Sequence, residues 1–130
     1  MSPLPADRVV VVDRLRELDL VVSRPVVYDA PIGLRLLHQE PGGAEHYLVR
    51  YPAGLTARWH RHTAAQSIVV LEGMLEANGE VVGPGSFCHF AAGEPMHHVP
   101  AGDAPCLFVT TFHGPFDVEP VGRPDGPGES

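Results

Sequence analysis

The stretch from Gly54 to Gly73, GLTARWHRHTAAQSIVVLEG, decides how this sequence is interpreted. In a β-strand, successive side chains point to opposite faces, so His60 and His62 project from one face with backbones roughly 6 to 7 Å apart. Two imidazoles placed in this way can converge on one ion. Gln66 follows after a three-residue gap that can turn the chain, which would bring an amide oxygen to the same centre. Such nitrogen and oxygen donors suit a first-row transition metal rather than calcium.

The rest of the chain consists of short apolar runs separated by turn signals. Its 130 residues suggest one domain, and 14 glycines with 14 prolines in a chain that is 44% hydrophobic favour short strands over a helical bundle. The expected strands are Val26–Tyr28, Leu34–His38, His46–Tyr51, Leu55–His62, Ser67–Glu72, Met74–Ala77, Glu80–Val82, Ser86–Phe90 and Cys106–Phe112. Asn78-Gly79 between two of these runs predicts a type I′ hairpin turn. Regular short strands of this kind indicate a sandwich or a barrel.

Both ends of the chain differ from this pattern. Residues 1–24 form an expected arm, with a valine-rich strand at Arg8–Asp13 and a helical turn within Arg14–Leu20. Because sheet edges need covering, this arm is expected to contact a second chain in a homodimer. Residues 25–118 are the expected barrel, and residues 119–130 a flexible tail rich in proline and glycine.

Composition excludes several classes of function. The net charge is −7, with nine arginines and no lysine, and no run of like charge could follow a phosphate backbone. A chain without lysine performs no Schiff-base chemistry and has no P-loop. We therefore expect a small-molecule substrate and no nucleic-acid or membrane partner. Without a recognisable signal peptide, a cytoplasmic location is expected. Cys88 and Cys106 are too few for a disulfide framework and are interpreted as small buried residues.

The motif around His60 resembles the first motif of the cupin superfamily. That motif reads glycine, five residues, His-x-His, three or four residues, glutamate, six residues, glycine. Here Gly54, His60, His62, Gln66 and Gly73 occupy those places with every gap kept, and glutamine replaces the glutamate.

The second cupin motif is matched more loosely. Gly85 and Gly93 fit it, whereas Ala91, Met96 and Pro100 stand where proline, histidine and asparagine are expected. The resemblance covers about residues 47–112. It implies an all-β fold, the antiparallel double-sheet jelly-roll (cupin) barrel, with one divalent transition metal per chain inside.

The resemblance also implies a third histidine ligand, which must be His97 or His98. An insertion of two residues after Gly93 would supply His98 and keep the inward and outward alternation of the strand, so His98 is preferred and His97 is the alternative. His113 is a possible extra ligand, ahead of His46 and His89, which are more typical of satisfied polar groups in strands.

Catalytic roles are assigned to three further side chains. His97, as the imidazole that does not ligate, would be the base, since imidazole is the side-chain group suited to proton transfer near working pH. Tyr47 shares a strand face with Tyr51, and either could donate a hydrogen bond to an enolate. Arg58 shares the side of His60 and could hold a carboxylate or phenolate of the substrate.

Glutamine in place of glutamate bears on the reaction. Because neutral Gln66 leaves the full charge on the ion, the site favours a Lewis acid such as zinc over iron, nickel or manganese. The expected function is a metal-dependent enzyme of isomerase, cyclase or lyase type acting on a small carbonyl, enol or polyketide-like substrate. One alternative is an Fe(II)-dependent cupin dioxygenase cleaving a diketone-like or phenolic substrate. A second is a non-catalytic sensor cupin that binds a metal or ligand.

Overall fold

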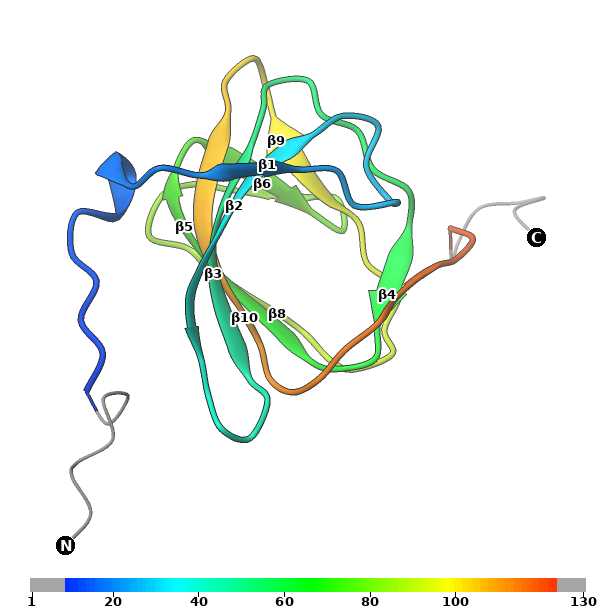
Figure 1. Cartoon of the computed structure of the whole chain (residues 1–130). Helices are drawn as coiled ribbons and strands as arrows, with labels where there is room; N and C mark the ends of the chain where they lie inside the picture. The colour runs from blue at the N-terminus through cyan, green and yellow to red at the C-terminus, as the bar shows by residue number, and fades with distance from the viewer. Residues whose placement is uncertain (1–8, 124–130) are drawn as a thin grey trace, which may run out of the picture.

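The computed structural model describes residues 9–123, and the regular structure of this part is almost entirely β-strand. The described strands are β1 (Val21–Ser23), β2 (Ile32–Gln39), β3 (Glu45–Tyr51), β4 (His60–His62), β5 (Gln66–Glu72), β6 (Met74–Ala77), β7 (Glu80–Val82), β8 (Phe87–Phe90), β9 (His98–Ala101), β10 (Cys106–Phe112) and β11 (Val118–Pro120). One 3-10 turn, η1 (Leu15–Glu17), precedes them. In Figure 1 the strands form the wall of a barrel and η1 lies outside it.

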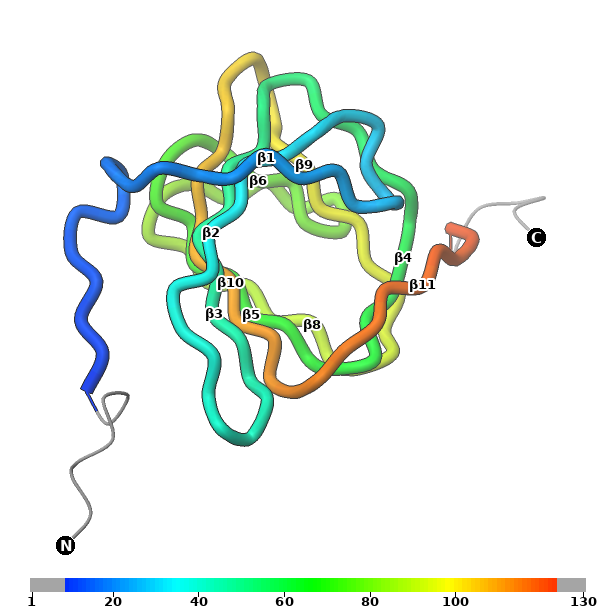
Figure 2. The backbone as a smooth tube through the Cα atoms, viewed as in Figure 1, coloured from blue at the N-terminus to red at the C-terminus, as the bar shows by residue number. Residues whose placement is uncertain are grey.

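The wall is made of one large sheet facing two small ones. The large sheet has the order β1-β2-β3-β10-β5-β8, and every neighbouring pair is antiparallel. The facing sheets have the orders β11-β4 and β7-β6-β9, and a bridge links His60 of β4 to Met96, two residues before β9. The tube in Figure 2 follows the chain around this wall. The predicted antiparallel jelly-roll barrel is confirmed.

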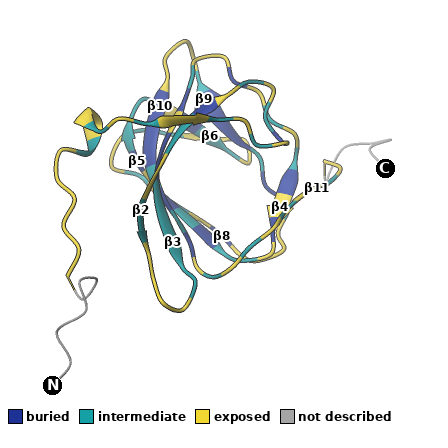
Figure 3. Cartoon of the chain, viewed as in Figure 1, coloured by how far each residue is buried: buried dark blue, intermediate teal, exposed yellow. Residues whose placement is uncertain are grey.

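Alternation along the strands separates the barrel interior from its surface. On β10 the side chains of Cys106, Phe108, Thr110 and Phe112 are buried, and on β5 those of Gln66, Ile68 and Val70 are buried. Figure 3 shows the buried segments on β4, β5, β9 and β10. The apolar members of this set contribute roughly 1.5–3 kcal/mol each when fully buried. This core therefore holds the polar donors on β4, β5 and β9 in fixed positions.

Two turns depend on backbone with positive φ. Gly73, which closes the first motif, has φ +78°, and a Cβ atom there would lie 2.2 Å from the carbonyl oxygen of Pro105. Only glycine fits this place between β5 and β6. Asn78 and Gly79 have φ values of 48° and 91°, as the predicted type I′ hairpin turn requires.

The described strands differ from the predicted ones in several places. Of the run Leu55–His62 only β4 is a strand, and Val26–Tyr28 contributes a single bridge, from Tyr28 to Ala57. Three short strands, β1, β9 and β11, were not predicted. β9 contains Pro100, and a proline disfavours a strand because it has no N–H to donate. However, β9 lies at the edge of its sheet, where a proline can be accommodated.

The interpretation of Arg8–Asp13 as a strand is corrected. Arg8 lies outside the described residues, and residues 9–13 form no strand. Val9 and Val11 are 78% and 82% exposed. A valine run has high β-propensity, but it forms a strand only where another strand accepts its hydrogen bonds. The sheets also extend beyond the expected barrel, through β1 and β11.

The C-terminal tail and the N-terminal arm are described only in part, since the structure covers residues 9–123. Of the tail at 119–130, residues 124–130 lie outside the described residues. Between residues 9 and 123, no helix has the length and apolar character needed to cross a bilayer. The homodimer stays a prediction.

Candidate metal centre

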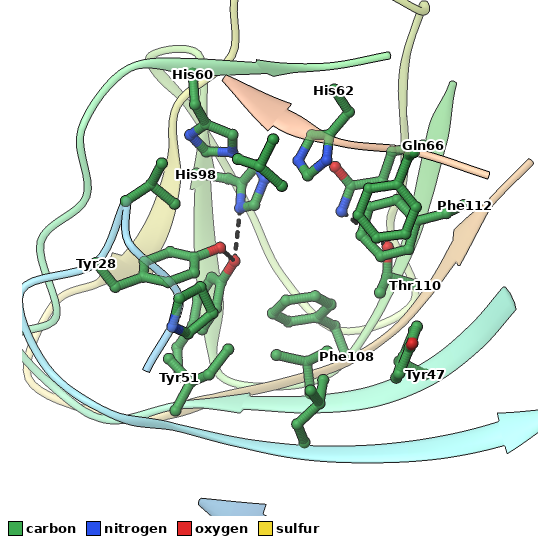
Figure 4. Close-up of a pocket in the computed structure, with 17 residues that line it drawn as sticks. Tyr28, Tyr47, Tyr51, His60, His62, Gln66, His98, Phe108, Thr110 and Phe112 are labelled. Carbon is green, nitrogen blue, oxygen red and sulfur yellow. Dashed lines mark hydrogen bonds between the residues drawn. The ribbon is translucent and has the colours of Figure 1, made fainter. Parts of the chain in front are cut away.

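Four buried donor side chains meet on the inner face of the barrel (Figure 4). His60 and His62 come from β4, Gln66 is the first residue of β5, and His98 is the first residue of β9. One ligating nitrogen from each histidine lies within 4.8 Å of those of the other two. Arg61, between the two β4 histidines, is exposed and pairs with Glu119 at 2.7 Å. The alternation of β4 therefore separates the donors from the surface, as the HxH spacing predicts.

Hydrogen bonds on the far ring nitrogens orient two of the histidines. His60 Nδ1 lies 2.9 Å from the backbone carbonyl oxygen of Arg58, which can only accept, so Nδ1 carries the hydrogen. His98 Nδ1 lies 2.7 Å from the hydroxyl of Tyr51. In both rings Nε2 is buried and unpaired. Such contacts on the second nitrogen are how proteins fix the ring of a metal-ligating histidine.

The amide of Gln66 is oriented by Thr110. The Thr110 hydroxyl donates to the carbonyl oxygen of Ser67 at 3.0 Å, so its oxygen accepts from Gln66 Nε2 at 2.9 Å. This arrangement leaves the amide oxygen of Gln66 buried and unpaired. The amide therefore presents an oxygen, not a nitrogen, to the histidines.

His62 is held by packing. Its ring lies 5.0 Å from that of Phe112 and 5.4 Å from that of Phe116, measured between centroids, and these two phenyl rings stack on each other at 3.8 Å. Both ring nitrogens of His62 are buried and unpaired. The aromatic wall fixes the plane of the ring and leaves its nitrogens available.

Burial keeps the three histidines neutral. Desolvation lowers the pKa of His62 to about 4 and that of His60 below its ordinary value. Burial, with the neighbouring histidines as a smaller contribution, lowers the pKa of His98 well below its usual range. Neutral imidazoles keep the lone pairs that a metal requires.

The donor set fits a divalent transition metal. An unpaired buried polar atom costs about 1–3 kcal/mol, so proteins seldom leave several together without a partner. The unpaired buried atoms gathered in this centre are His60 Nε2, both ring nitrogens of His62, Gln66 Oε1 and His98 Nε2. Three imidazole nitrogens and an amide oxygen around one point are ligands that zinc, iron, nickel or manganese would accept.

A cavity of about 150 Å³ adjoins these donors. Aromatic and aliphatic side chains make up most of its wall, among them Tyr28, Phe108 and Phe116. None of the described residues that line it carries an aspartate, glutamate, lysine or arginine side chain. The polar side chains among the described lining residues are those of the four donors, of three tyrosines (Tyr28, Tyr47 and Tyr51) and of Thr110.

Two residues predicted to act in catalysis lie elsewhere. His97 does not line the cavity: its ring stacks on Trp59 at 5.5 Å, and its backbone N–H donates to Asn78 Oδ1 at 2.8 Å. Adjacent strand residues face opposite ways, so placing His98 inside places His97 outside. Arg58 is exposed, and its contact with the site is the backbone carbonyl that orients His60. Neither His97 as base nor Arg58 as anion clamp agrees with this geometry.

His113, the possible extra ligand, also lies away from the centre. Its Nε2 is 2.8 Å from the Ser67 hydroxyl on the outer face of the large sheet, and His89 Nδ1 is 2.9 Å from the same hydroxyl. His46, also on this face, contacts Thr111 and Glu40. These histidines are satisfied polar groups of the surface.

Tyr47 and Tyr51 do line the cavity, as their shared parity on β3 predicts. The Tyr47 hydroxyl, however, donates to Glu45 at 2.8 Å, and burial together with this carboxylate raises the pKa of Tyr47 to about 12. The Tyr51 hydroxyl contacts His98 and, at 2.6 Å, the hydroxyl of Tyr28. Both hydroxyls are therefore engaged by the protein.

Sequence reasoning missed Tyr28 and Thr110. Thr110 stands at an inward position of Cys106–Phe112, where the other inward residues are apolar, so alternation along this strand could have found it. Tyr28 lies in a loop whose residues have no regular alternation, and only the fold brings it beside Tyr51.

We expect Thr110→Val to weaken metal binding by about tenfold or more, because loss of a group that orients a ligand typically costs 10- to 100-fold in affinity. The Gln66 amide would lose its acceptor and its fixed orientation. The matched control is Thr111→Val on the outer face, which should stay within about twofold of the parent. Competition titration of zinc against a chromophoric chelator measures both, and equal affinities for the two variants would contradict the role of Thr110.

Comparison with known proteins agrees with this fold. The sequence pattern of the family described as Cupin domain matches residues 47–112, half of the chain. The chain therefore belongs to the cupin family. A search of curated protein sequences gave no significant match.

Several solved structures share the fold. A cupin-like protein from Thermotoga maritima superposes with a TM-score of 0.69 at 15% identity, covering 79% of this chain and 86% of that one. An acetylacetone dioxygenase from Acinetobacter johnsonii gives 0.69 at 19% identity, covering 90% and 80%. The polyketide cyclase RemF from Streptomyces resistomycificus gives 0.65 at 23% identity, covering 82% and 83%. At these identities the likeness shows the fold alone.

Proposed function

We propose that this cupin is a metal-dependent enzyme that acts on a small, uncharged carbonyl or enol compound. The observation that carries the proposal is the set of neutral donors, His60, His62, Gln66 and His98, buried at the wall of an apolar cavity. A divalent metal bound by these donors would supply Lewis-acid chemistry, with its charge undiminished by any carboxylate ligand.

The size and lining of the cavity support a small substrate. A cavity of about 150 Å³ is the size that holds a benzene molecule in an engineered protein. A single ring or a short dicarbonyl compound would fill it, whereas a fused polyketide would have to extend beyond it. With no charged side chain among the described lining residues, a carboxylate or phosphate group on the substrate would find no counter-ion there.

The lining also bears on proton transfer. Its described residues offer no carboxylate and no imidazole outside the donor set, and burial raises the pKa of both Tyr28 and Tyr47 to about 12. None of these groups is a base near neutral pH. The site therefore favours substrates that enolise readily or enter already as an enol or phenol.

An Fe(II) dioxygenase that cleaves a diketone-like or phenolic compound is the second candidate, because the same small neutral cavity would accept its substrate. The test measures how fast zinc-loaded protein interconverts the keto and enol forms of acetylacetone, with and without air, while an oxygen electrode records oxygen uptake. We expect faster interconversion, equally fast without air, and no oxygen uptake, because this isomerisation needs no co-reactant. Activity confined to iron-loaded protein, with oxygen consumed in proportion to product, would contradict the Lewis-acid proposal and favour the dioxygenase. Metal uptake without turnover of the compound tested would favour the remaining alternative, a non-catalytic sensor cupin that binds a metal or ligand.

A further inference from the structure

We infer that the hydroxyl of Tyr28 is the hydrogen-bond donor that the cavity presents to an oxygen atom of its ligand. The inference rests on the proposed function, since it takes His98 as a metal ligand. It follows from the direction of hydrogen bonds in a chain of three side chains: His98, Tyr51 and Tyr28.

The direction is set at His98. The Nε2 atom of this ring faces the other histidines and is unpaired, so it is the atom that would ligate the metal, through its lone pair. A neutral imidazole has one hydrogen, which must then reside on Nδ1. His98 Nδ1 therefore donates to the Tyr51 hydroxyl oxygen at 2.7 Å.

Tyr51 accepts a hydrogen bond from His98 and donates one to Tyr28. Its side chain is fully buried, so its hydroxyl hydrogen needs an acceptor inside the protein. Within the described residues its hydroxyl has two partners, His98 Nδ1 and the Tyr28 hydroxyl. Nδ1 already carries a hydrogen and cannot accept. Tyr51 therefore donates to Tyr28 at 2.6 Å.

Tyr28 ends the chain at the cavity. Its oxygen accepts from Tyr51, so its own hydrogen must point elsewhere, and no second partner for it exists among the described residues. Tyr28 lines the cavity, and its hydroxyl ends in the space below the histidines (Figure 4). An oxygen-bearing ligand is the acceptor that completes this chain. Tyr47 cannot replace Tyr28 in this role, because its hydroxyl is committed to Glu45.

The test compares two probes on protein saturated with Co²⁺. The visible absorption of the bound Co²⁺ reports ligand binding directly, so no activity has to be measured. Acetylacetone binds as an enolate whose oxygens accept hydrogen bonds. Imidazole binds through one nitrogen and has only an N–H at the other, so it offers no acceptor. We expect Tyr28→Phe to weaken acetylacetone about tenfold, since a hydrogen bond to a charged group is lost, and to leave imidazole within about twofold.

Tyr51→Phe is the matched variant. It removes the acceptor of His98 Nδ1 and should weaken Co²⁺ itself, yet Tyr28 keeps its hydroxyl, so the ratio of the two probe affinities should stay near that of the parent. An unchanged ratio in Tyr28→Phe with Co²⁺ bound would overturn the inference and leave the proposed function intact. Parent protein that binds no Co²⁺ would instead contradict the proposed function and remove the basis of the inference with it.

Discussion

His98→Ala is expected to lower metal affinity by about a hundredfold to a thousandfold. Structural zinc sites have apparent binding free energies of roughly 10–16 kcal/mol, so one of four ligands accounts for about 2.5–4 kcal/mol. His98 is buried and presents an unpaired Nε2 to the two histidines of β4. Metal content after dialysis against a weak chelator measures the loss. His60→Ala and His62→Ala should give losses of similar size.

The neighbouring residue provides the control. His97→Ala removes an imidazole one position away, but that ring packs on Trp59 outside the cavity, so metal content should remain that of the parent. Circular dichroism of the metal-free proteins checks that each variant folds. Loss of metal in His97→Ala together with full retention in His98→Ala would reverse the assignment of the third histidine.

Gln66→Glu is expected to retain the metal and to lose about two orders of magnitude in turnover. A carboxylate attracts the cation more strongly than an amide does, but its charge weakens the stabilisation of negative charge that develops on the substrate oxygen. The structure adds a local requirement. In the parent protein the Thr110 hydroxyl donates to the carbonyl oxygen of Ser67 and accepts from the Gln66 amide. Because a carboxylate can only accept, this hydroxyl must rotate to donate to the glutamate of the variant.

Gln39→Glu makes the same chemical change at an exposed position of β2 and should leave turnover unchanged. Steady-state kinetics with metal content measured on the same samples separate turnover from occupancy. A Gln66→Glu variant as active as the parent, with oxygen consumed in proportion to product, would count against Lewis-acid chemistry and for the dioxygenase.

The parts of the site that follow strand alternation could be predicted from the sequence. The HxH spacing on one strand, with Gln66 opening the next, placed three donors on one inner face. The same parity argument favoured His98 over His97, and in the structure His98 lies inside and His97 outside. It also placed Tyr47 and Tyr51 on the cavity wall.

The parts that depend on loops and neighbouring strands could not be predicted. Arg58 precedes β4 in a segment that is not a regular strand, so its parity with His60 had no meaning there. Tyr28 reaches Tyr51 from a loop, and the pairing of Gln66 with Thr110 joins residues far apart in the sequence. Such contacts arise from the closure of the barrel, which no local pattern encodes.

X-ray absorption spectroscopy at the K-edge of the metal, on protein purified without added metal, tests the central claim most directly. We predict about one first-row transition metal per chain, a first shell of nitrogen and oxygen at about 2.0–2.2 Å, and outer-shell scattering from about three imidazoles. A sulfur shell at about 2.3 Å, or scattering from fewer than two imidazoles, would contradict a centre formed by His60, His62, Gln66 and His98.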